Sequence, residues 1–245
     1  MHILRTIKGG QAGDFFRRVN FALLPLGSIE YHGGLAHLGT DAILADYFAD
    51  FLSEHYACAR YPAITYTPLP GKTAAYPGGI TVRPEVFLMY LQDILSGILG
   101  SGVKKILLLN AHDGNMGLSR AAAEAVSGVF AEADILLVNW WQLTDPRWCE
   151  QECGLRGGGR GHGGAYEISA AYAALGETFV SSPGERNLSS EQLDAPVPYT
   201  RIQGRPENWE GRTGNLDEAS AEAGEKILAK AKYNLLQLIN QWLGN

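Results

Sequence analysis

Short continuous apolar runs alternate along the chain with longer segments in which apolar residues recur every three or four positions. A continuous apolar run is typical of a strand buried on both faces, and the longer period is typical of an amphipathic helix. On this pattern, strands are expected at residues 21–26, 60–69, 105–109 and 134–141. Helices are expected at residues 41–55, 84–99, 117–130, 165–174 and 217–242.

The alternation of these strands and helices predicts the fold class. Parallel strands are joined by crossover connections, and these connections place helices on both faces of the sheet. We therefore expect an α/β fold with three layers, α/β/α, around a largely parallel central sheet. The length suits one large domain, so residues 1–245 are expected to form a single domain. Residues 181–213 show no periodicity and are expected to form a lid, an arm or an oligomer contact.

The first polar cluster directly follows the first expected strand, where binding sites of parallel sheets form. Its residues are Glu30, Tyr31 and His32, and Asp41 follows at the start of the first expected long helix. Glu30 and His32 are two positions apart, so in an extended segment both side chains point to the same side. Carboxylates and imidazoles are common ligands of Zn, Mn and Fe. Asp41 could bridge two ions, or it could simply cap its helix.

Two further polar clusters carry histidines. Residues 110–115 (Asn-Ala-His-Asp-Gly-Asn) follow the third expected strand and place His112 at the same edge of the sheet, as a ligand or as a turn residue. Residues 157–167 hold six glycines within their first eight positions and carry His162 and Glu167. Such a segment can approach a ligand closely and bring His162 to the site. The alternatives are a surface loop or a phosphate cradle, but the Lys-Ser/Thr of a P-loop is missing.

Composition excludes several classes of function. The net charge is −6 and no basic tract is present, which argues against nucleic acid as a partner. No apolar run is long enough for a membrane span, and the N-terminal residues lack the apolar core of a signal peptide. The chain has only three cysteines, and this small, odd number argues against a framework of disulfides and favours a reducing compartment. A cytoplasmic location without a membrane partner is therefore expected.

The motifs around these clusters resemble those of the creatininase family. Residues 24–33 (Leu-Pro-Leu-Gly-Ser-Ile-Glu-Tyr-His-Gly), with Gly-Thr-Asp at 39–41, match the Glu-x-His…Asp pattern of that family. Residues 110–115 resemble its Asn-Gly-His-Gly-Gly-Asn motif. His162, Glu167 and Ser169 resemble the family's His-Ala-Gly-Glu-x-Glu-Thr-Ser motif. Residues 76–78 resemble its Pro-Gly-Thr loop, and residues 213–215 resemble another shared turn.

The resemblance implies a metal-dependent amidohydrolase with one or two divalent ions, Zn, Mn or Fe. It implies that Glu30, Asp41 and His112 hold one ion, and that Asp41 bridges to a second ion near His32. Glu167 or a water would complete the second site. The resemblance further implies that His162 acts as a general acid or steadies developing charge, together with Glu167 as a catalytic residue. The residues expected to contact substrate are Tyr76, Gly78, Asn115 and Gly163.

Several positions depart from the family pattern. Gly114 stands where creatininase has a metal-binding Glu, and the neighbouring Asp113 is expected to point elsewhere. Gly158 stands where creatininase has a Trp that closes over its substrate. We therefore expect a small-molecule substrate other than creatinine, with a non-standard amide, cyclic amide or formamide bond.

Two alternative functions remain open at this point. The first is a creatininase-like peptidase that trims a modified precursor peptide in a biosynthetic pathway. The second is a non-catalytic binding protein on a degenerate hydrolase fold, supported by the missing Glu at position 114. Members of the family commonly form hexamers, so the resemblance also implies a homo-oligomer.

Overall fold

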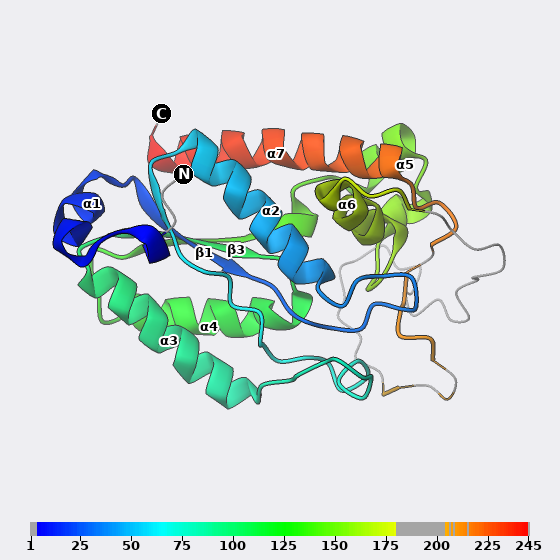
Figure 1. Cartoon of the computed structure of the whole chain (residues 1–245), viewed down its shortest axis with the longest axis horizontal. Coiled ribbons are helices and arrows are strands. Elements are labelled where there is room, and N and C mark those ends of the chain that lie inside the picture. Colours follow the sequence, from blue (N-terminus) through cyan, green and yellow to red (C-terminus); the bar gives the residue numbers. More distant parts are fainter. Residues whose placement is uncertain (1–3, 180–203, 206, 208, 215, 245) are drawn as a thin grey trace.

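A four-stranded parallel sheet lies between two layers of helices (Figure 1). The computed structural model describes residues 4–179, 204, 205, 207, 209–214 and 216–244. The strand order is β2-β1-β3-β4, and every neighbouring pair is parallel. The expected three-layer α/β/α fold is confirmed. The segment predicted at 181–213 lies largely outside the described residues.

The elements follow the chain in regular alternation. The strands are β1 (Phe21–Leu26), β2 (Cys58–Arg60), β3 (Lys105–Asn110) and β4 (Asp134–Asn139). The α-helices are α1 (Ala12–Arg18), α2 (Thr40–His55), α3 (Pro84–Gly100), α4 (Met116–Ser127), α5 (Pro146–Cys153), α6 (Ala165–Leu175) and α7 (Ala221–Leu243). Short 3-10 helices occur at Leu4–Thr6, Gly9–Gln11, Asp113–Asn115, Trp140–Gln142 and Arg156–Gly159.

The two faces of the central strands are covered by different helical layers. Phe21 and Leu23 of β1 pack in a core cluster with residues of α2, α6 and α7. Ala22, Leu24 and Leu26 face the other side and pack with residues of α3 and α4. Successive side chains of a strand point to opposite faces, so an uninterrupted apolar run fills both layers. This explains why β1 was recognisable in the sequence as one continuous apolar segment.

Two predicted strands have the wrong bounds. The strand expected at 60–69 is only Cys58–Arg60, and beyond it a single isolated bridge joins Ile64 to Leu26. Pro62 and Pro68 have no N–H to donate to a ladder, which limits regular pairing there. The strand expected to be buried at 134–141 ends at Asn139, and its first four residues are only partly buried or exposed because β4 is an edge strand.

The helix predictions differ from the structure mainly at their ends. The last helix begins at Ala221 rather than at 217, because the Ser220 hydroxyl accepts a hydrogen bond from the Ala223 N–H and caps it. The helix expected at 117–130 ends at Ser127, before Gly128. Helices α1 and α5 were not predicted, since both are short.

The carboxyl ends of β1 and β3 lie next to each other. Leu26 and Asn110 are paired in the register, and the Ala111 N–H donates to the Leu26 carbonyl at 2.8 Å. The segments that follow these strands therefore leave the sheet side by side. No helix in the described part of the chain is both long and apolar enough to span a bilayer.

Candidate metal centre

The structure brings together all six residues that the sequence analysis singled out as ligands or catalytic groups. Their segments are the loop after β1, the first turn of α2, the loop after β3, and the glycine-rich segment that leads into α6. Four of the six are almost fully buried, with at most 4% of each residue exposed: Glu30, His32, Asp41 and His112. The side chains of His162 and Glu167 keep small exposed fractions and connect the cluster with solvent.

Glu30, Asp41 and His112 form a first group that could hold an ion. His112 Nδ1 lies 3.1 Å from Glu30 Oε2 and 2.9 Å from Asp41 Oδ2. Two hydroxyls orient the carboxylates: the Ser28 hydroxyl donates to Asp41 Oδ2 at 2.8 Å, and the Thr73 hydroxyl donates to Glu30 Oε1. One oxygen of Glu30 is therefore fixed by Thr73, and the other faces the cluster.

His32, Asp41 and Glu167 form a second such group. His32 Nε2 lies 3.2 Å from Asp41 Oδ1 and 3.7 Å from Glu167 Oε2. Asp41 thus presents Oδ2 to the first group and Oδ1 to the second. A carboxylate that offers one oxygen to each of two neighbouring ligand groups has the geometry of a bridging ligand.

Asp41 does not cap α2. The N-cap residue is Gly39, and no side-chain hydrogen bond caps this helix. The side chain of Asp41 instead points to Ser28, His32 and His112. The capping alternative from the sequence is therefore wrong.

Each histidine of the cluster has one ring nitrogen on a main-chain carbonyl. His32 Nδ1 lies 3.0 Å from the Glu30 carbonyl, His112 Nε2 lies 3.0 Å from the Pro68 carbonyl, and His162 Nε2 lies 2.8 Å from the Tyr31 carbonyl. A carbonyl only accepts hydrogen bonds, so each of these nitrogens carries a hydrogen. In a neutral imidazole the other nitrogen is then a lone pair, and in all three rings it faces carboxylate oxygens.

This arrangement of lone pairs and carboxylates suits a bound cation. Lone pairs and carboxylate oxygens repel each other at these distances unless a proton or a metal ion lies between them. Glu30 Oε2 and His32 Nε2 are buried and make no hydrogen bond within the described part of the chain. Carbonyls that hold the far nitrogen of metal-binding histidines are a common supporting feature of metal sites. The donor set therefore fits one or two divalent ions.

The pKa values of the buried groups also indicate that the cluster favours bound positive charge. Burial alone would lower the pKa of His32, but Asp41 and Glu167 outweigh burial and raise it to about 10. The pKa of His112 is raised well above its usual value by Asp41 and Glu30, against the effect of burial. Burial alone would raise the pKa of Asp41, but His32 and His112 lower it. Without another cation, the cluster holds its charge balance by protonating histidines.

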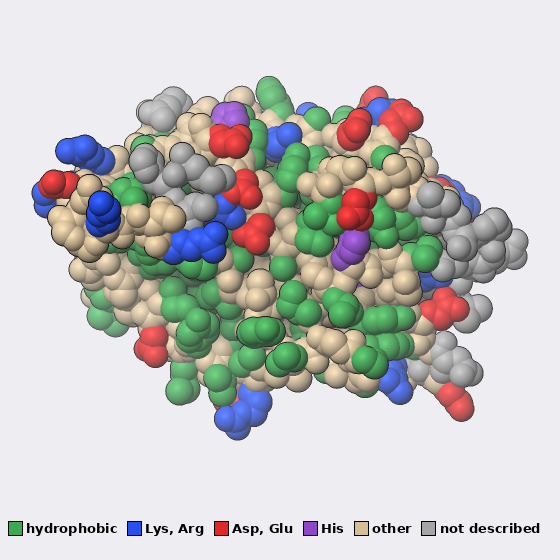
Figure 2. Space-filling view, in the orientation of Figure 1, with side chains coloured by type: hydrophobic (Ala, Val, Ile, Leu, Met, Phe, Trp, Pro, Cys, Tyr) green, Lys and Arg blue, Asp and Glu red, His purple; other side chains and the backbone are tan. Residues whose placement is uncertain are grey.

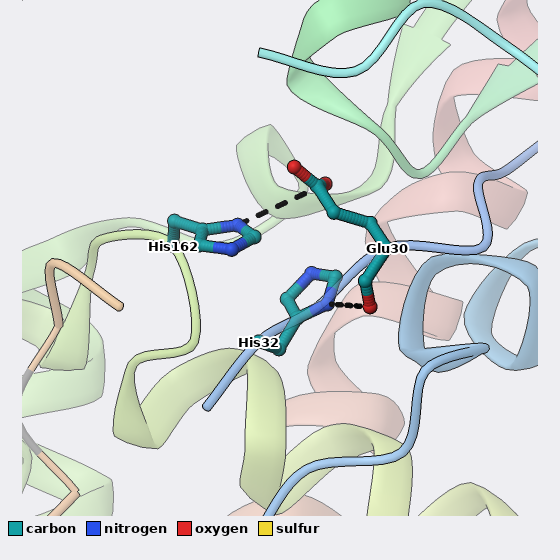
Figure 3. Close-up of side chains that lie close together, drawn as sticks. All are labelled: Glu30, His32 and His162. Carbon is teal, nitrogen blue, oxygen red and sulfur yellow. Dashed lines mark hydrogen bonds and ion pairs between the residues drawn. The ribbon is translucent and has the colours of Figure 1, made fainter. Parts of the chain in front are cut away.

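Glu167 and His162 are shifted in opposite directions. Burial raises the pKa of Glu167 to about 7, so this carboxyl can take up or release a proton near neutral pH. Burial, with repulsion from His32, lowers the pKa of His162 to about 4, so this imidazole is neutral at pH 7. His162 packs against His32 with ring centroids 4.1 Å apart, and its Nδ1 lies 3.9 Å from Glu30 Oε2 (Figure 3).

Two of the residues expected to contact substrate lie beside the cluster. Tyr76 stacks on Tyr31, with ring centroids 4.1 Å apart and an interplanar angle of 5°. Gly163 has a φ of +64°, and its N–H donates to Glu167 Oε2 at 2.9 Å. A Cβ at Gly163 would lie 2.5 Å from the His32 carbonyl oxygen, so only glycine permits this approach.

The other two residues expected to contact substrate make contacts within the protein. Asn115 is fully buried, and its side-chain amide donates to the Gly27 carbonyl at 3.1 Å, which holds the turn after β1. Gly78 has a φ of +90°, and a Cβ there would lie 2.5 Å from the Leu38 side chain.

The departures at positions 114 and 158 have steric causes. A Cβ at Gly114 would lie 2.5 Å from His112 Nε2 and 2.9 Å from the Pro68 carbonyl oxygen, so glycine leaves room for the contact that orients His112. Asp113 is exposed and lies outside the ligand groups found among the described residues. Gly158 has a φ of +76°, and a Cβ there would lie 2.8 Å from the Cα of Pro146. Neither position can carry a large side chain in this backbone.

Sequence reasoning missed three neighbours of the centre: Ser28, Thr73 and Trp209. Ser28 lies within the motif around Glu30, but nothing in the sequence shows that its hydroxyl points to Asp41. Thr73 reaches Glu30 from a loop 43 positions away. Trp209 lies in the aperiodic segment, and its ring is inclined by 26° to that of His162, with centroids 6.5 Å apart. These contacts join segments that are distant in the sequence, so no local pattern predicts them.

Comparison with known proteins identifies the family. A family profile described as creatinine amidohydrolase matches residues 8–239. The chain belongs to the creatininase family. The family resemblance inferred from the motifs is thereby confirmed.

Two curated relatives of this creatininase-family chain match over part of their length. The 3-dehydro-scyllo-inosose hydrolase of Thermotoga maritima is 25% identical over 174 residues, covering 71% of this chain and 53% of that protein. The creatinine amidohydrolase of Pseudomonas putida is 23% identical over 163 residues, covering 62% of this chain and 63% of that protein. The matched regions thus span between half and two thirds of these relatives.

Solved structures agree with the family fold over the whole chain. A structure named "Creatininase Mn" has a TM-score of 0.78 at 18% identity and covers 99% of both chains. A mutant creatininase of "Zn-Zn type" has a TM-score of 0.79 at 17% identity and covers 99% of this chain and 98% of its own. A putative creatinine amidohydrolase from Bacteroides fragilis has a TM-score of 0.74 at 19% identity, and the match covers 100% of this chain and 97% of that chain. At these identities the likeness establishes the fold.

Proposed function

We propose that this creatininase-family chain is a metal-dependent hydrolase of a non-standard C–N bond in a small molecule. The bond would be an amide, a cyclic amide or a formamide. The observation that carries the proposal is Asp41, which presents one oxygen to each of two buried ligand groups. Both curated relatives are named as hydrolases, and the names of two solved relatives include Mn and Zn. These names support a divalent ion, with Zn, Mn and Fe as the candidates.

The proposed ligands divide between the two groups. Glu30, Asp41 and His112 would hold one ion, and His32, Asp41 and Glu167 would surround a second. A bound divalent ion lowers the pKa of its water and polarises a substrate carbonyl. The Ser28 hydroxyl holds the Asp41 carboxylate in place by donating a hydrogen bond to it, and the Thr73 hydroxyl does the same for Glu30.

Glu167 is the residue we propose as the proton acceptor. It is a carboxylate at the partly exposed side of the cluster. Its pKa of about 7 belongs to the metal-free protein, and a cation bound beside it would lower that pKa. The Gly163 N–H fixes one carboxylate oxygen. The oxygen that carries the hydrogen bond from Gly163 is also the one that faces His32.

His162 would act on the leaving nitrogen. Its low pKa keeps the ring neutral at pH 7, and Nε2 carries the hydrogen that faces the Tyr31 carbonyl. Nδ1 must therefore take up a proton before the ring can give one to the leaving group. In this order Glu167 first takes the proton of the attacking water, and His162 Nδ1 then takes that proton up and delivers it to the leaving nitrogen.

The test is metal content measured by plasma mass spectrometry on protein purified without a metal-affinity tag. We expect one or two equivalents of Zn, Mn or Fe in the wild-type protein and little or none in Asp41→Ala. Asp93→Ala, which removes an exposed carboxylate of α3, is the matched control and should retain the metal. A wild-type protein without metal, even after reconstitution, would favour the non-catalytic binding protein.

The substrate screen that follows should compare chemical classes. Cyclic amides, formamides and open-chain amides test the proposed C–N bond. Short peptides with and without a modified terminus test the alternative of a precursor-trimming peptidase. An oxidised cyclitol should be included because one curated relative is named for an inosose. Turnover of the cyclitol alone by the metal-loaded protein would contradict the C–N assignment and leave the metal centre standing.

A further inference from the structure

The glycine-rich segment 157–164 contains only two residues that are not glycine, Arg160 and His162. Of its six glycines, all except Gly164 have a positive φ. Glycine loses more conformational freedom on folding than any other residue, so a segment of this composition is costly to hold in one conformation. It therefore needs an anchor outside its own backbone.

The guanidinium of Arg160 provides such an anchor on the segment that follows β4. Its Nη1 donates to the Trp141 carbonyl at 2.6 Å, and its Nη2 donates to the Thr144 carbonyl at 2.8 Å and to the Thr144 hydroxyl at 3.0 Å. The planar fork of a guanidinium can donate to several acceptors at once, which the single ammonium of a lysine cannot reproduce in the same geometry.

The same guanidinium lies on the ring of Tyr166, in the first turn of α6. Its Cζ is 3.7 Å from the ring centroid. The Tyr166 and Thr144 hydroxyls share a hydrogen bond of 2.8 Å, so Arg160, Thr144 and Tyr166 form a closed set of contacts. Within the described part of the chain, the polar partners of Arg160 are all uncharged groups. The contacts therefore fix a direction and do not form an ion pair.

Beyond Arg160, the segment holds a residue of the second ligand group in place. The Gly163 N–H donates to Glu167 Oε2 at 2.9 Å, and this oxygen lies 3.7 Å from His32 Nε2. The main-chain N–H of His162 donates to the Thr213 hydroxyl at 2.9 Å. The segment is thus held from two sides, by the end of β4 through Arg160 and by Thr213.

We infer that Arg160 is a positioning residue for the second ligand group: it fixes the glycine-rich segment so that the Gly163 N–H holds Glu167 toward His32. This inference rests on the proposed metal-dependent function. The first ligand group comes from the loops after β1 and β3 and from α2, so its affinity for an ion should not depend on Arg160. The difference between the two groups makes the inference testable without a substrate.

Stepwise zinc binding, measured on the full chain by competition with chelators, separates the two groups. Arg160→Met should weaken one zinc equivalent by about 10–100-fold, the usual effect of losing a group that orients a ligand. The other equivalent should change by less than about twofold. Weakening of both equivalents to the same extent, or of neither, would overturn the inference. Arg120→Met removes an exposed guanidinium from α4 and should leave both equivalents unchanged.

Glu167→Gln tests whether the effect of Arg160 passes through this carboxylate. Two substitutions that act through the same contact do not add, so Arg160→Met should weaken zinc binding no further in the Glu167→Gln protein. A further loss there would show a general structural role and contradict the inference. Arg160→Lys keeps the charge without the fork and should behave like Arg160→Met. Normal zinc binding in Arg160→Lys would mean that charge, and not direction, is what matters.

Hydrogen exchange of the metal-free protein gives a readout that does not depend on zinc. Peptides covering residues 157–164 should exchange at least about tenfold faster in Arg160→Met than in the wild type, while peptides from β1 and β3 should be unchanged. Unchanged exchange in the segment, or faster exchange throughout the molecule, would overturn the inference.

The wild-type titration distinguishes failure of this inference from failure of the proposed function. A wild-type protein that takes up no zinc would contradict the metal-dependent function itself. A wild-type protein that binds a single equivalent would leave that function standing and overturn the role of Arg160 at a second ligand group.

Discussion

At Glu30 and Asp41, hydroxyl groups hold the carboxylates before any ion arrives. Thr73 donates to Glu30 and Ser28 donates to Asp41, and all four side chains are buried. Removing such a partner commonly lowers metal affinity by about 10–100-fold.

We expect Thr73→Val and Ser28→Ala each to weaken zinc binding within this range, measured by competition with a chelator. Ser127→Ala, an exposed hydroxyl on α4, should have no effect. Unchanged zinc affinity in Thr73→Val and Ser28→Ala would show that the ligands orient each other.

Metal binding should release protons from the histidines. The raised pKa values mean that the metal-free protein binds protons at His32 and His112 at pH 7, and an ion must displace them. Affinity should therefore fall as the pH falls, by up to about a hundredfold per pH unit if two protons are displaced. Calorimetry in two buffers with different ionisation enthalpies measures the release. Absence of released protons at pH 7 would contradict the charge state inferred for the metal-free cluster.

His162 and the metal ligands should respond differently to substitution. His162 is the most exposed histidine of the cluster and makes its shortest polar contact with the Tyr31 carbonyl rather than with a carboxylate. We expect His162→Ala to retain the metal and to lower kcat by about 10²–10⁴-fold, as for loss of an acid–base group. Metal content and turnover of the same preparation check this. Loss of the metal would make His162 a ligand.

At the level of elements, burial decides how well the sequence predicts the structure. β1, α2, α3, β3 and α6 were predicted to within one residue at each end, because their patterns match one face or two faces of a packed core. The segment 61–69 has similar apolar content, and its residues Tyr61 and Ile64 do donate to β1 carbonyls. Pro62 interrupts these bonds, so regular pairing ends at Arg60.

The candidate site was predictable where its residues lie in compact motifs. Glu30 and His32 are two positions apart after a recognisable strand, and His112 follows another, so their meeting follows from the strand order. Thr73 and Trp209 could not be predicted, because each reaches the centre from a segment without periodicity. Their positions depend on tertiary contacts that no local pattern encodes.

The packing of α7 on α6 makes a prediction at this scale. A Cβ at Gly224 of α7 would overlap the main-chain carbonyl of Ser169 in α6, which cannot move as a side chain can. We expect Gly224→Ala to lower the free energy of unfolding by about 1–3 kcal/mol, the usual range for overpacking. Urea denaturation of the metal-free protein measures it.

Gly97 provides the matched control for Gly224. It lies within α3, and a Cβ there would meet nothing within 4 Å. Gly97→Ala should therefore stabilise the protein by about 0.5–1 kcal/mol through helix propensity alone. If both substitutions were stabilising, the helices would be less tightly packed than the structure indicates.

On the scale of the whole molecule, an apolar patch predicts association. Hydrophobic side chains gather over α3 and the segment before it (Figure 2). The exposed large apolar side chains of these stretches are Tyr66 and Ile80 before α3 and Val86, Met89 and Tyr90 on α3, with exposed fractions between 38% and 62%. Patches of contiguous apolar side chains commonly mark interaction sites. The predicted homo-oligomer would cover such a patch with a second copy of the chain.

Light scattering coupled to size-exclusion chromatography tests this assembly. We expect a mass about six times the 26.5 kDa of one chain, in line with the family resemblance. Met89→Lys, which places a charge in the patch, should shift the distribution toward smaller species. A wild-type protein that stays monomeric at high concentration would contradict the homo-oligomer.

The carbonyls that hold the three histidines have a consequence for how such a protein can diverge. Every amino acid carries a main-chain carbonyl, so substitution at positions 31 or 68 leaves the orienting group for His162 or His112 in place. The orientation of these imidazoles therefore does not depend on which side chains occupy the two positions. The contact between Tyr31 and Tyr76 is made by side chains, so it has no such protection. A lineage built this way can exchange one substrate for another while its reactive centre stays the same.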